Sequence, residues 1–275
     1  MTVAPAIPTP PPSSLTETVT ALQRRFGPAA LRRGGDVVSS TAWATGMPAI
    51  DGLVAAGGLP CGRLSVLLAG NRGVSGRLTL LQALAAVASR SMQVAYVDLV
   101  GTLDPGFLAD LGADLDACLV VRPDQLAPGP GLAMARALVR AGVPWLGIAM
   151  APIRRSSAAA MEHAVSALAG AVEGSRAIAC VSAPAPLAAP LAYASSLTVE
   201  CASLGWQEAH GDVVGLRVGM RTLKSKVGAP SGEASLLLRY PRPQAMGEVV
   251  GFPAVVGHAG GDLAGLVAPA VAVAG

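Results

Sequence analysis

The sequence LLAGNRGVSGRLTL, residues 67–80, decides the fold of this chain, because it lies where a buried strand should turn into a helix. A phosphate-binding loop reads G-x-x-x-x-G-K-[ST] at such a turn: its amides surround the phosphates, its lysine contacts them and its hydroxyl binds Mg²⁺. Here Ser75 and Gly76 are kept, but Arg77 stands at the lysine position and Leu78 at the hydroxyl position. A leucine side chain has no oxygen with which to bind Mg²⁺. We therefore expect a phosphate loop that has lost its metal-binding chemistry.

The beginning of the loop is degenerate as well. Gly70 lies one residue before the position of the first consensus glycine, and Asn71 occupies that position. We expect at most weak binding of ATP or ADP here, and no bound cofactor. The residues of this degenerate nucleotide site are Gly70, Asn71, Gly73, Ser75, Gly76, Arg77, Leu78 and Thr79.

Short apolar strands alternate with helical patterns along the middle of the chain, which is typical of a mostly parallel sheet covered by helices. Strands are expected at 64–68, 94–98, 145–150 and 177–182, and helices at 79–89, 132–141 and 157–172. Later strands follow one another through turns alone, at 192–200, 213–223 and 234–240. This change predicts an antiparallel extension late in the chain. The fold class is therefore α/β, with a separate N-terminal helix.

The chain is expected to have four parts. Residues 1–12 form a Pro-rich, disordered leader, and 13–40 form an N-terminal helix and linker for oligomerisation or partner docking. Residues 41–243 form the core domain, and 244–275 form a low-complexity tail.

The N-terminal helix has a clear beginning and one apolar stripe. Ser14 to Glu17 fits a capping box, and the stripe consists of Leu15, Val19, Leu22 and Phe26. A helix of this length is marginal alone in water, so its stripe needs a partner surface. That surface belongs either to the chain's own domain or to a neighbouring subunit.

Composition excludes several classes of protein. Cys61, Cys118, Cys180 and Cys201 form no C-x-x-C pair and the histidines are scattered, so we expect buried, reduced cysteines and no metal site. No apolar run is long enough to span a membrane, and the N-terminus lacks the features of a signal peptide. We expect a cytoplasmic protein. The net charge of +3 is too small to indicate a nucleic-acid partner.

Four stretches in order resemble the RecA recombinase family, over residues 15–240. They are LQRRFG at 22–27, TGMPAID at 45–51 with GGLPCGR at 57–63, YVD at 96–98 with LDP at 103–105, and LAYASS at 191–196 with RTLKSKVGAP at 221–230. The resemblance implies a RecA-like phosphate-loop core. It also implies a catalytic Glu two residues after Asp98 and a metal-binding Asp at the end of the strand at 145–150. The chain has Val100 and Met150 instead, so we expect negligible ATP hydrolysis.

Other functions follow from the resemblance alone. Asp104 and Phe107 match positions that contact adenine, although Phe107 can also be read as a core aromatic. Lys224 and Lys226 match lysines that reach a neighbouring subunit's nucleotide, although a solvated strand end is the alternative.

The two DNA-binding loops of the family are altered here. The first is reduced to residues 152–157, where Arg154 and Arg155 either contact a DNA backbone or form a solvated pair at a helix start. The second, residues 183–190, is a short, Pro-rich, uncharged loop that cannot neutralise phosphates or stack bases. We expect weak DNA binding at most.

In these departures from the family pattern, the chain resembles the catalytically degenerate RecA paralogues of the ImuA type. That resemblance implies an accessory protein of the bacterial DNA-damage (SOS) response, nucleoid-associated, which modulates RecA or an error-prone translesion polymerase through protein contacts. Its partners would be RecA, subunits of such a polymerase, or a second copy of the chain. The alternatives are an active or weak ATP-dependent recombinase, in which Arg77 serves as the phosphate-binding cation, and a DNA-binding accessory protein.

Overall fold

The computed structural model describes residues 14–27, 41–70, 74–123, 128–151, 158–228, 232–239 and 256–258. The chain divides into two units, residues 1–38 and 39–275, and each is described by itself. Within the described residues, no helix is both long and apolar enough to cross a membrane.

The first unit contains helix α1 (Leu15–Phe26). Ser14 has an extended backbone, and its Oγ accepts a hydrogen bond from the backbone amide of Glu17 at 3.2 Å. The predicted cap is therefore confirmed. Arg24 and Arg25 lie in the last turn, where positive charge stabilises the exposed carbonyls, and the Arg25 guanidinium lies 5.2 Å from the ring centroid of Phe26.

The second unit is built on one sheet, in which the described strands follow the order β11-β10-β9-β8-β3-β7-β6-β4-β5. Its parallel part pairs β3 with both β7 and β8, and β4 with both β5 and β6. These strands are β3 (Arg63–Ala69), β4 (Val94–Asp98), β5 (Cys118–Val121), β6 (Trp145–Ala149) and β7 (Ile178–Ala183). The predicted parallel core is confirmed.

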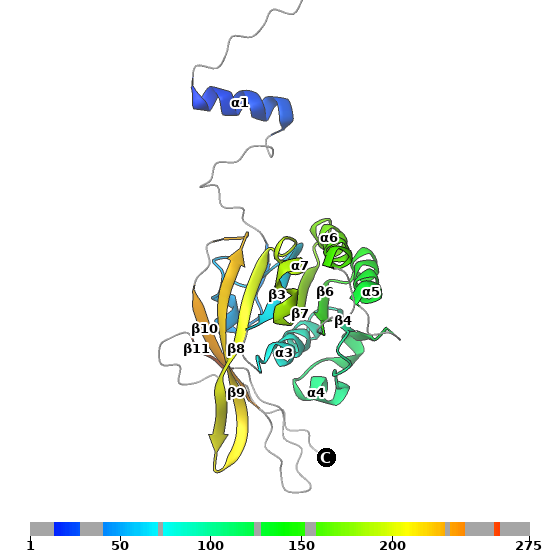
Figure 1. Ribbon diagram of the computed structural model, residues 1–275, viewed down its shortest axis with the longest axis vertical. Helices are drawn as coiled ribbons and strands as arrows, with labels where there is room; N and C mark the ends of the chain where they lie inside the picture. The colour runs from blue at the N-terminus through cyan, green and yellow to red at the C-terminus, as the bar shows by residue number, and fades with distance from the viewer. Residues whose placement is uncertain are drawn as a thin grey trace, which may run out of the picture. The chain divides into compact units, whose positions relative to one another are not determined.

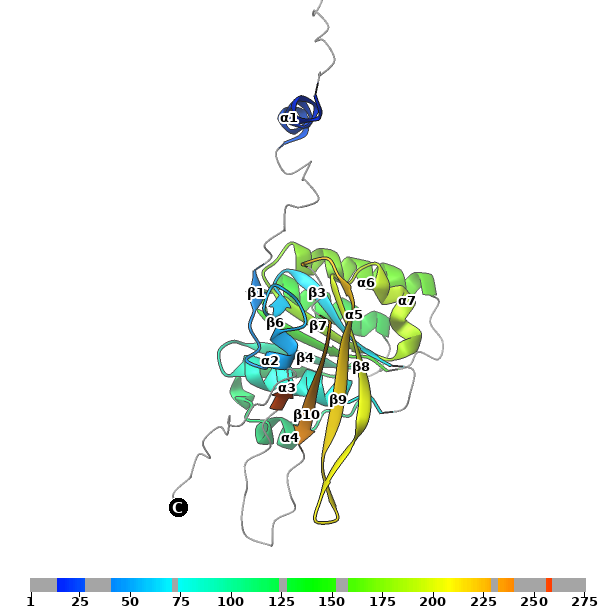
Figure 2. The ribbon, with the colours of Figure 1, turned by 90° about the vertical axis from the view of Figure 1, so that its left-hand side faces the viewer.

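The antiparallel part of the sheet contains the three predicted strands and one more, which lies in the segment 244–275 that was predicted as a low-complexity tail. It contains β8 (Leu197–Ala209), β9 (Asp212–Ser225), β10 (Glu233–Arg239) and β11 (Val256–His258). A two-residue turn joins β8 to β9, and both of its residues have positive φ: His210 at 54° and Gly211 at 86°. The resulting hairpin projects beyond the rest of the sheet (Figures 1 and 2).

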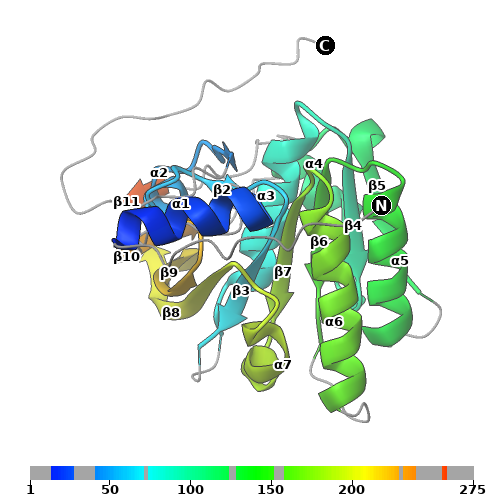
Figure 3. The same cartoon turned by 90° about the horizontal axis from the view of Figure 1, so that it is seen from above.

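Helices cover the two faces of the parallel part (Figure 3). One face is covered by α3 (Arg77–Ser89), α4 (Pro105–Asp110) and the short α2 (Pro48–Asp51), and the other by α5 (Pro128–Arg140), α6 (Ala158–Glu173) and α7 (Ala188–Ala192). The smaller elements are β1 (Ala42–Trp43), β2 (Leu59–Pro60), and the 3₁₀ turns η1 (Leu115–Ala117) and η2 (Ala185–Leu187).

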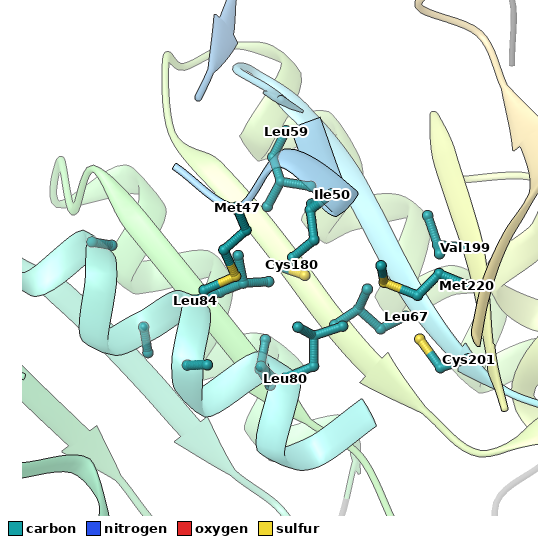
Figure 4. Packing of buried hydrophobic residues seen from close by; sticks show 14 of the residues in the cluster. Met47, Ile50, Leu59, Leu67, Leu80, Leu84, Cys180, Val199, Cys201 and Met220 are labelled. Atoms are coloured by element: carbon teal, nitrogen blue, oxygen red, sulfur yellow. The ribbon is translucent and has the colours of Figure 1, made fainter. Parts of the chain in front are cut away.

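The core beneath α3 connects the parallel and antiparallel parts of the sheet. Leu80 of α3 faces Leu67 of β3, Leu84 lies toward Met47, and the same cluster continues through Val199 and Met220 (Figure 4). Cys180 and Cys201 are buried in this cluster as predicted, whereas Cys61 and Cys118 are only half-buried. Burial raises the pKa of the Cys201 thiol to about 12, so this cysteine behaves as a small apolar residue.

Two sequence predictions differ from the structure. The segment at 183–190 was predicted as a loop. Its residues 185–190 instead form η2 and most of α7, because Leu187 and Leu191 pack into the core beneath α6. For the same reason β8 begins at Leu197 rather than at 192. The edge strand β5 and the helix α4 had no predicted counterpart.

Candidate functional site

The degenerate phosphate loop lies between β3 and α3, at the carboxyl edge of the parallel strands. The structure describes Gly70 and residues 74–76 of it, whereas Asn71, Arg72 and Gly73 lie outside the described residues. The amide of Gly70 donates to the carbonyl of Cys201 at 2.8 Å, and the carbonyl of Val74 accepts from the amide of Ser203 at 3.1 Å. Both ends of the loop are therefore tied to strand β8.

Gly76 occupies the N-cap position of α3 in the left-handed region, with φ of 68°. A Cβ atom at this position would lie 2.5 Å from the Val218 Cγ2 atom and 3.1 Å from the Leu238 Cδ1 atom. The loop thus packs closely against apolar side chains of β9 and β10. Both the backbone conformation and this packing require glycine here.

Arg77 stands in the first turn of α3, and its side chain turns toward the neighbouring strand. Its Nη1 donates a hydrogen bond to the Ser182 Oγ, near the end of β7, at 2.7 Å. Burial lowers the pKa of the Arg77 guanidinium from its ordinary value. An arginine nevertheless stays protonated in proteins. Arg77 is thus a half-buried cation whose described hydrogen bond holds it against the sheet.

A cavity of about 380 Å³ opens beside the loop. Most of its wall is apolar, and the residues that line it are Ala69, Val74, Ser75, Gly76, Arg77, Leu78, Thr79, Pro184 and Leu216. None of these lining residues carries a carboxylate, and Leu78 lines the cavity at the position where a hydroxyl would bind Mg²⁺. The described residues therefore do not fit the Mg²⁺ ion that a working phosphate loop employs.

The neighbouring strand ends do not supply the missing groups. Beside β7, strand β6 ends in Ala149 and is followed by the fully buried Met150. Val100, beyond the end of β4, is half-buried and packs against the core. Among the described residues, no group of three or more His, Cys, Asp or Glu side chains could hold a metal ion.

The buried carboxylate of Asp98, at the end of β4, has structural partners. It accepts hydrogen bonds from the amides of Val100, Gly101 and Leu103, and from the Arg122 Nε at 3.1 Å. Burial alone would raise the pKa of Asp98. The three amides and Arg122 outweigh burial, so the pKa lies below its ordinary value. Asp98 therefore anchors the segment that leads from β4 to α4.

The two residues matched to adenine contacts both belong to the α4 region. Asp104 is the N-cap of α4, and its Oδ1 accepts from the amide of Gly106 at 2.9 Å. Phe107 lies within α4 and is half-buried. Neither residue lines the cavity beside the phosphate loop.

Lys224 and Lys226 lie at the opposite edge of the sheet, beside the start of β8. The Lys224 Nζ donates to the carbonyls of Ala192 and, at 2.8 Å, Ser195, and the Lys226 Nζ donates to the carbonyl of Tyr193 at 3.0 Å. Burial, and then the charge of Lys226, lowers the pKa of Lys224. Lys224 is half-buried and Lys226 is exposed, and both bond carbonyls at the end of α7.

The remaining predicted residues lie either outside the described residues or in the first unit. Arg154 and Arg155 lie outside the described residues. The docking stripe of Leu15, Val19, Leu22 and Phe26 belongs to the first unit, and α1 buries none of its own residues. Sequence reasoning missed Ser182, Arg122 and Leu216. Only Ser182 carried a signal, as a polar residue inside an otherwise apolar strand.

Comparison with known proteins shows which family this sequence resembles. The family model described as the RecA N-terminal domain matches residues 13–167. The chain is 37% identical to Protein RecA of Thioalkalivibrio sulfidiphilus over 133 residues, which are 47% of this chain and 38% of that protein. It is 33% identical to Protein RecA of Haemophilus ducreyi over 132 residues, which are 47% of this chain and 34% of the relative. The chain thus spans about a third of the length of these curated relatives.

Proposed function

This chain belongs to the RecA N-terminal domain family, and on that premise we propose that it is a non-hydrolysing accessory member of the family. In this proposal it acts in the bacterial DNA-damage response, beside the nucleoid. It modulates RecA, or an error-prone translesion polymerase, through protein contacts. The polymerase part rests on analogy with the ImuA type of paralogue.

The observation that carries the proposal is the set of residues in the phosphate loop and just beyond the ends of strands β4 and β6. ATP hydrolysis in a phosphate-loop protein needs a hydroxyl and a carboxylate for Mg²⁺, and a residue that positions water. Leu78, Met150 and Val100 stand at those three positions, and none offers an oxygen from its side chain. Arg77, the one cation among the described residues of the lining, donates a hydrogen bond to Ser182.

Helix α1 supports the second half of the proposal. It combines the Ser14 cap with an apolar stripe. An apolar stripe of this kind can bind in a groove of another protein, with Phe26 as the aromatic anchor. We propose that the helix docks on a RecA protomer, and that the remainder of the chain then blocks growth of the filament or recruits the polymerase.

Measuring phosphate release tests the proposal that the chain does not hydrolyse ATP. The purified full chain is incubated with ATP and Mg²⁺, with and without single-stranded DNA, beside RecA of the same organism as the positive control. We expect release indistinguishable from a protein-free blank, and no change on Arg77→Ala. Steady release that Arg77→Ala abolishes would favour the alternative, a recombinase with an unorthodox site.

A binding measurement tests the proposal that α1 docks on a RecA protomer. The full chain is immobilised, and RecA of the same organism is passed over it with and without ATP and single-stranded DNA. We expect saturable binding of RecA. Substituting the apolar residues of the α1 stripe with alanine should weaken it. Absence of binding to RecA under all these conditions would overturn this partner and leave the polymerase subunits to be tested in the same way.

A further inference from the structure

The antiparallel part of the sheet has one face in the core and one face outside it. Leu216, Val218 and Met220 of β9, with Leu236 and Leu238 of β10, belong to the core beneath α3. Because side chains alternate along a strand, the residues between them lie on the opposite face, which we call the open face. The core beneath α6 includes no described residue of β8, β9 or β10. The helical layer that covers the parallel strands therefore does not extend over the open face in the described part of the chain.

A hollow of about 610 Å³ is lined by residues of β8, β9 and β10, most of them on the open face. Its floor is a row of small residues, since Gly219 pairs with Ala202 on one side and with Ser235 on the other. Leu204 is 59% exposed and lies over this row. A Cβ atom on Gly219 would be 3.1 Å from the Leu204 Cδ2 atom. The hollow thus combines an exposed apolar side chain with a floor that leaves room for others.

Strand β11 brings the chain to the edge of this hollow. Its last residue, His258, pairs with Ser235 in the floor. Residues 259–275 follow in the sequence, and apart from Asp262 and Pro269 they are all Gly, Ala, Val or Leu. We call this segment the apolar tail. Half of it, extended, would span more than the roughly 10 Å that separates β10 from β8.

We propose that the apolar tail binds in this hollow and covers the open face of the antiparallel strands. Burying its Val and Leu side chains is favourable, and the small residues of the floor provide the space for them. The charge of the tail also fits this face, because Asp262 follows β11 by only four residues and Arg217 and Arg221 both lie on the open face. The described hydrogen bond of the Arg217 side chain is to the neutral Gln207, so its charge can pair with a carboxylate.

The cover has a structural consequence that the proposed function does not include. The tail supplies for β8, β9 and β10 the second layer that α5, α6 and α7 supply for the parallel strands. While the tail is bound, a second protein cannot contact the apolar surface at Leu204 without displacing it. Exposed apolar surface of this kind promotes self-association, so the tail also keeps copies of the chain apart.

Hydrogen exchange followed by mass spectrometry tests the proposal on the full chain. A segment that buries its side chains must also hydrogen-bond its buried amides, so binding slows their exchange. We expect exchange within residues 262–274 at least about tenfold slower than in an isolated peptide of the same sequence. Ser235→Trp fills the hollow and should raise the rate to that of the peptide. Leu119→Trp is the control, because Leu119 is a half-exposed residue on β5, at the opposite edge of the sheet.

A second variant changes the tail and leaves the sheet intact. Leu266→Asp places a charge among the apolar residues of the tail and should abolish the slow exchange there, while exchange in β3 and β7 reports that the chain is folded. Exchange of the unmodified tail at the peptide rate would overturn the proposal, as would slow exchange that persists in a folded Ser235→Trp variant. The protection should also be independent of protein concentration. Protection that disappears on tenfold dilution would overturn binding within one chain and assign the hollow to the tail of a second copy.

Discussion

Arg77 and Ser182 are joined by a hydrogen bond of 2.7 Å between Nη1 and Oγ, which connects the first turn of α3 to the end of β7. The residue that replaces the phosphate-binding lysine thus has a structural partner within the sheet. Ser182 is fully buried, whereas Arg77 is only half-buried. Removing one partner therefore leaves a buried group unpaired in one case and a half-buried group in the other, so the two losses should change the free energy of unfolding by different amounts.

The asymmetry predicts the stability of two variants. Arg77→Met leaves the buried Ser182 hydroxyl without its described partner and should cost about 1–3 kcal/mol of unfolding free energy. Ser182→Ala leaves a guanidinium that water can reach, so it should cost less, about 1 kcal/mol. Urea unfolding of both variants and of the double variant measures the coupling between them. Equal costs with no coupling would contradict the structural role of this bond.

The lowered pKa of Asp98 predicts that the free energy of unfolding depends on pH. Its folded pKa lies below the unfolded value of about 3.9, so ionised Asp98 stabilises the fold above that pH. This contribution is lost as the pH falls through the depressed folded pKa. Asp98→Asn should cost about 2 kcal/mol at pH 7 and progressively less as the pH falls below about 4.

Unfolding in urea across this pH range checks the prediction. Asp104→Asn is the matched control, because asparagine caps α4 as well as aspartate does and little change is expected at any pH. A cost for Asp98→Asn that is independent of pH would show that charge is not what Asp98 contributes.

Substitution of Phe26 distinguishes a role of α1 in an interface from a role in the hydrophobic core. Burying an aromatic of this size contributes about 1.5–3 kcal/mol, so Phe26→Ala should weaken association with RecA, or with a second copy, at least about tenfold. The melting temperature should stay nearly unchanged. Calorimetry and a binding titration give the two values. Thr20→Ala is the control, because the described hydrogen bond of its hydroxyl is to the Thr16 carbonyl of the same helix. A variant that melts early yet still binds would eliminate the interface interpretation.

Binding of single-stranded DNA should be weak and salt-sensitive. The segment at 183–190 is uncharged and helical, and its packing against the core leaves nothing on which bases could stack. Contacts from arginine and lysine alone, two or three in number, should lose roughly tenfold in affinity between 50 and 200 mM salt. Fluorescence anisotropy with a labelled oligothymidylate measures this. Tight binding that persists at 200 mM salt would reveal a DNA site elsewhere on the chain.

The parallel core could be predicted because its signals are local. Strand β4 is found at its predicted residues, 94–98, and β3, β6 and β7 lie within one residue of theirs at each end, since each is a short, mostly apolar run. The Ser14 cap of α1 was predictable for the same reason, because its donor lies three residues away. The edge strand β5 was missed because it is short and only partly buried.

The sequence by itself determined which oxygen-bearing groups the phosphate loop lacks, since Leu78, Val100 and Met150 lack them in any conformation. Only the tertiary structure decided where the remaining charges go. Arg77 bonds a serine 105 residues away, and Lys224 bonds carbonyls about 30 residues away. Such partners depend on strand order and on the helical conformation of the connection from β7 to β8. A long charged side chain that has no ligand donates its hydrogen bonds to whichever acceptor the packed fold places within reach. No local sequence pattern encodes that acceptor.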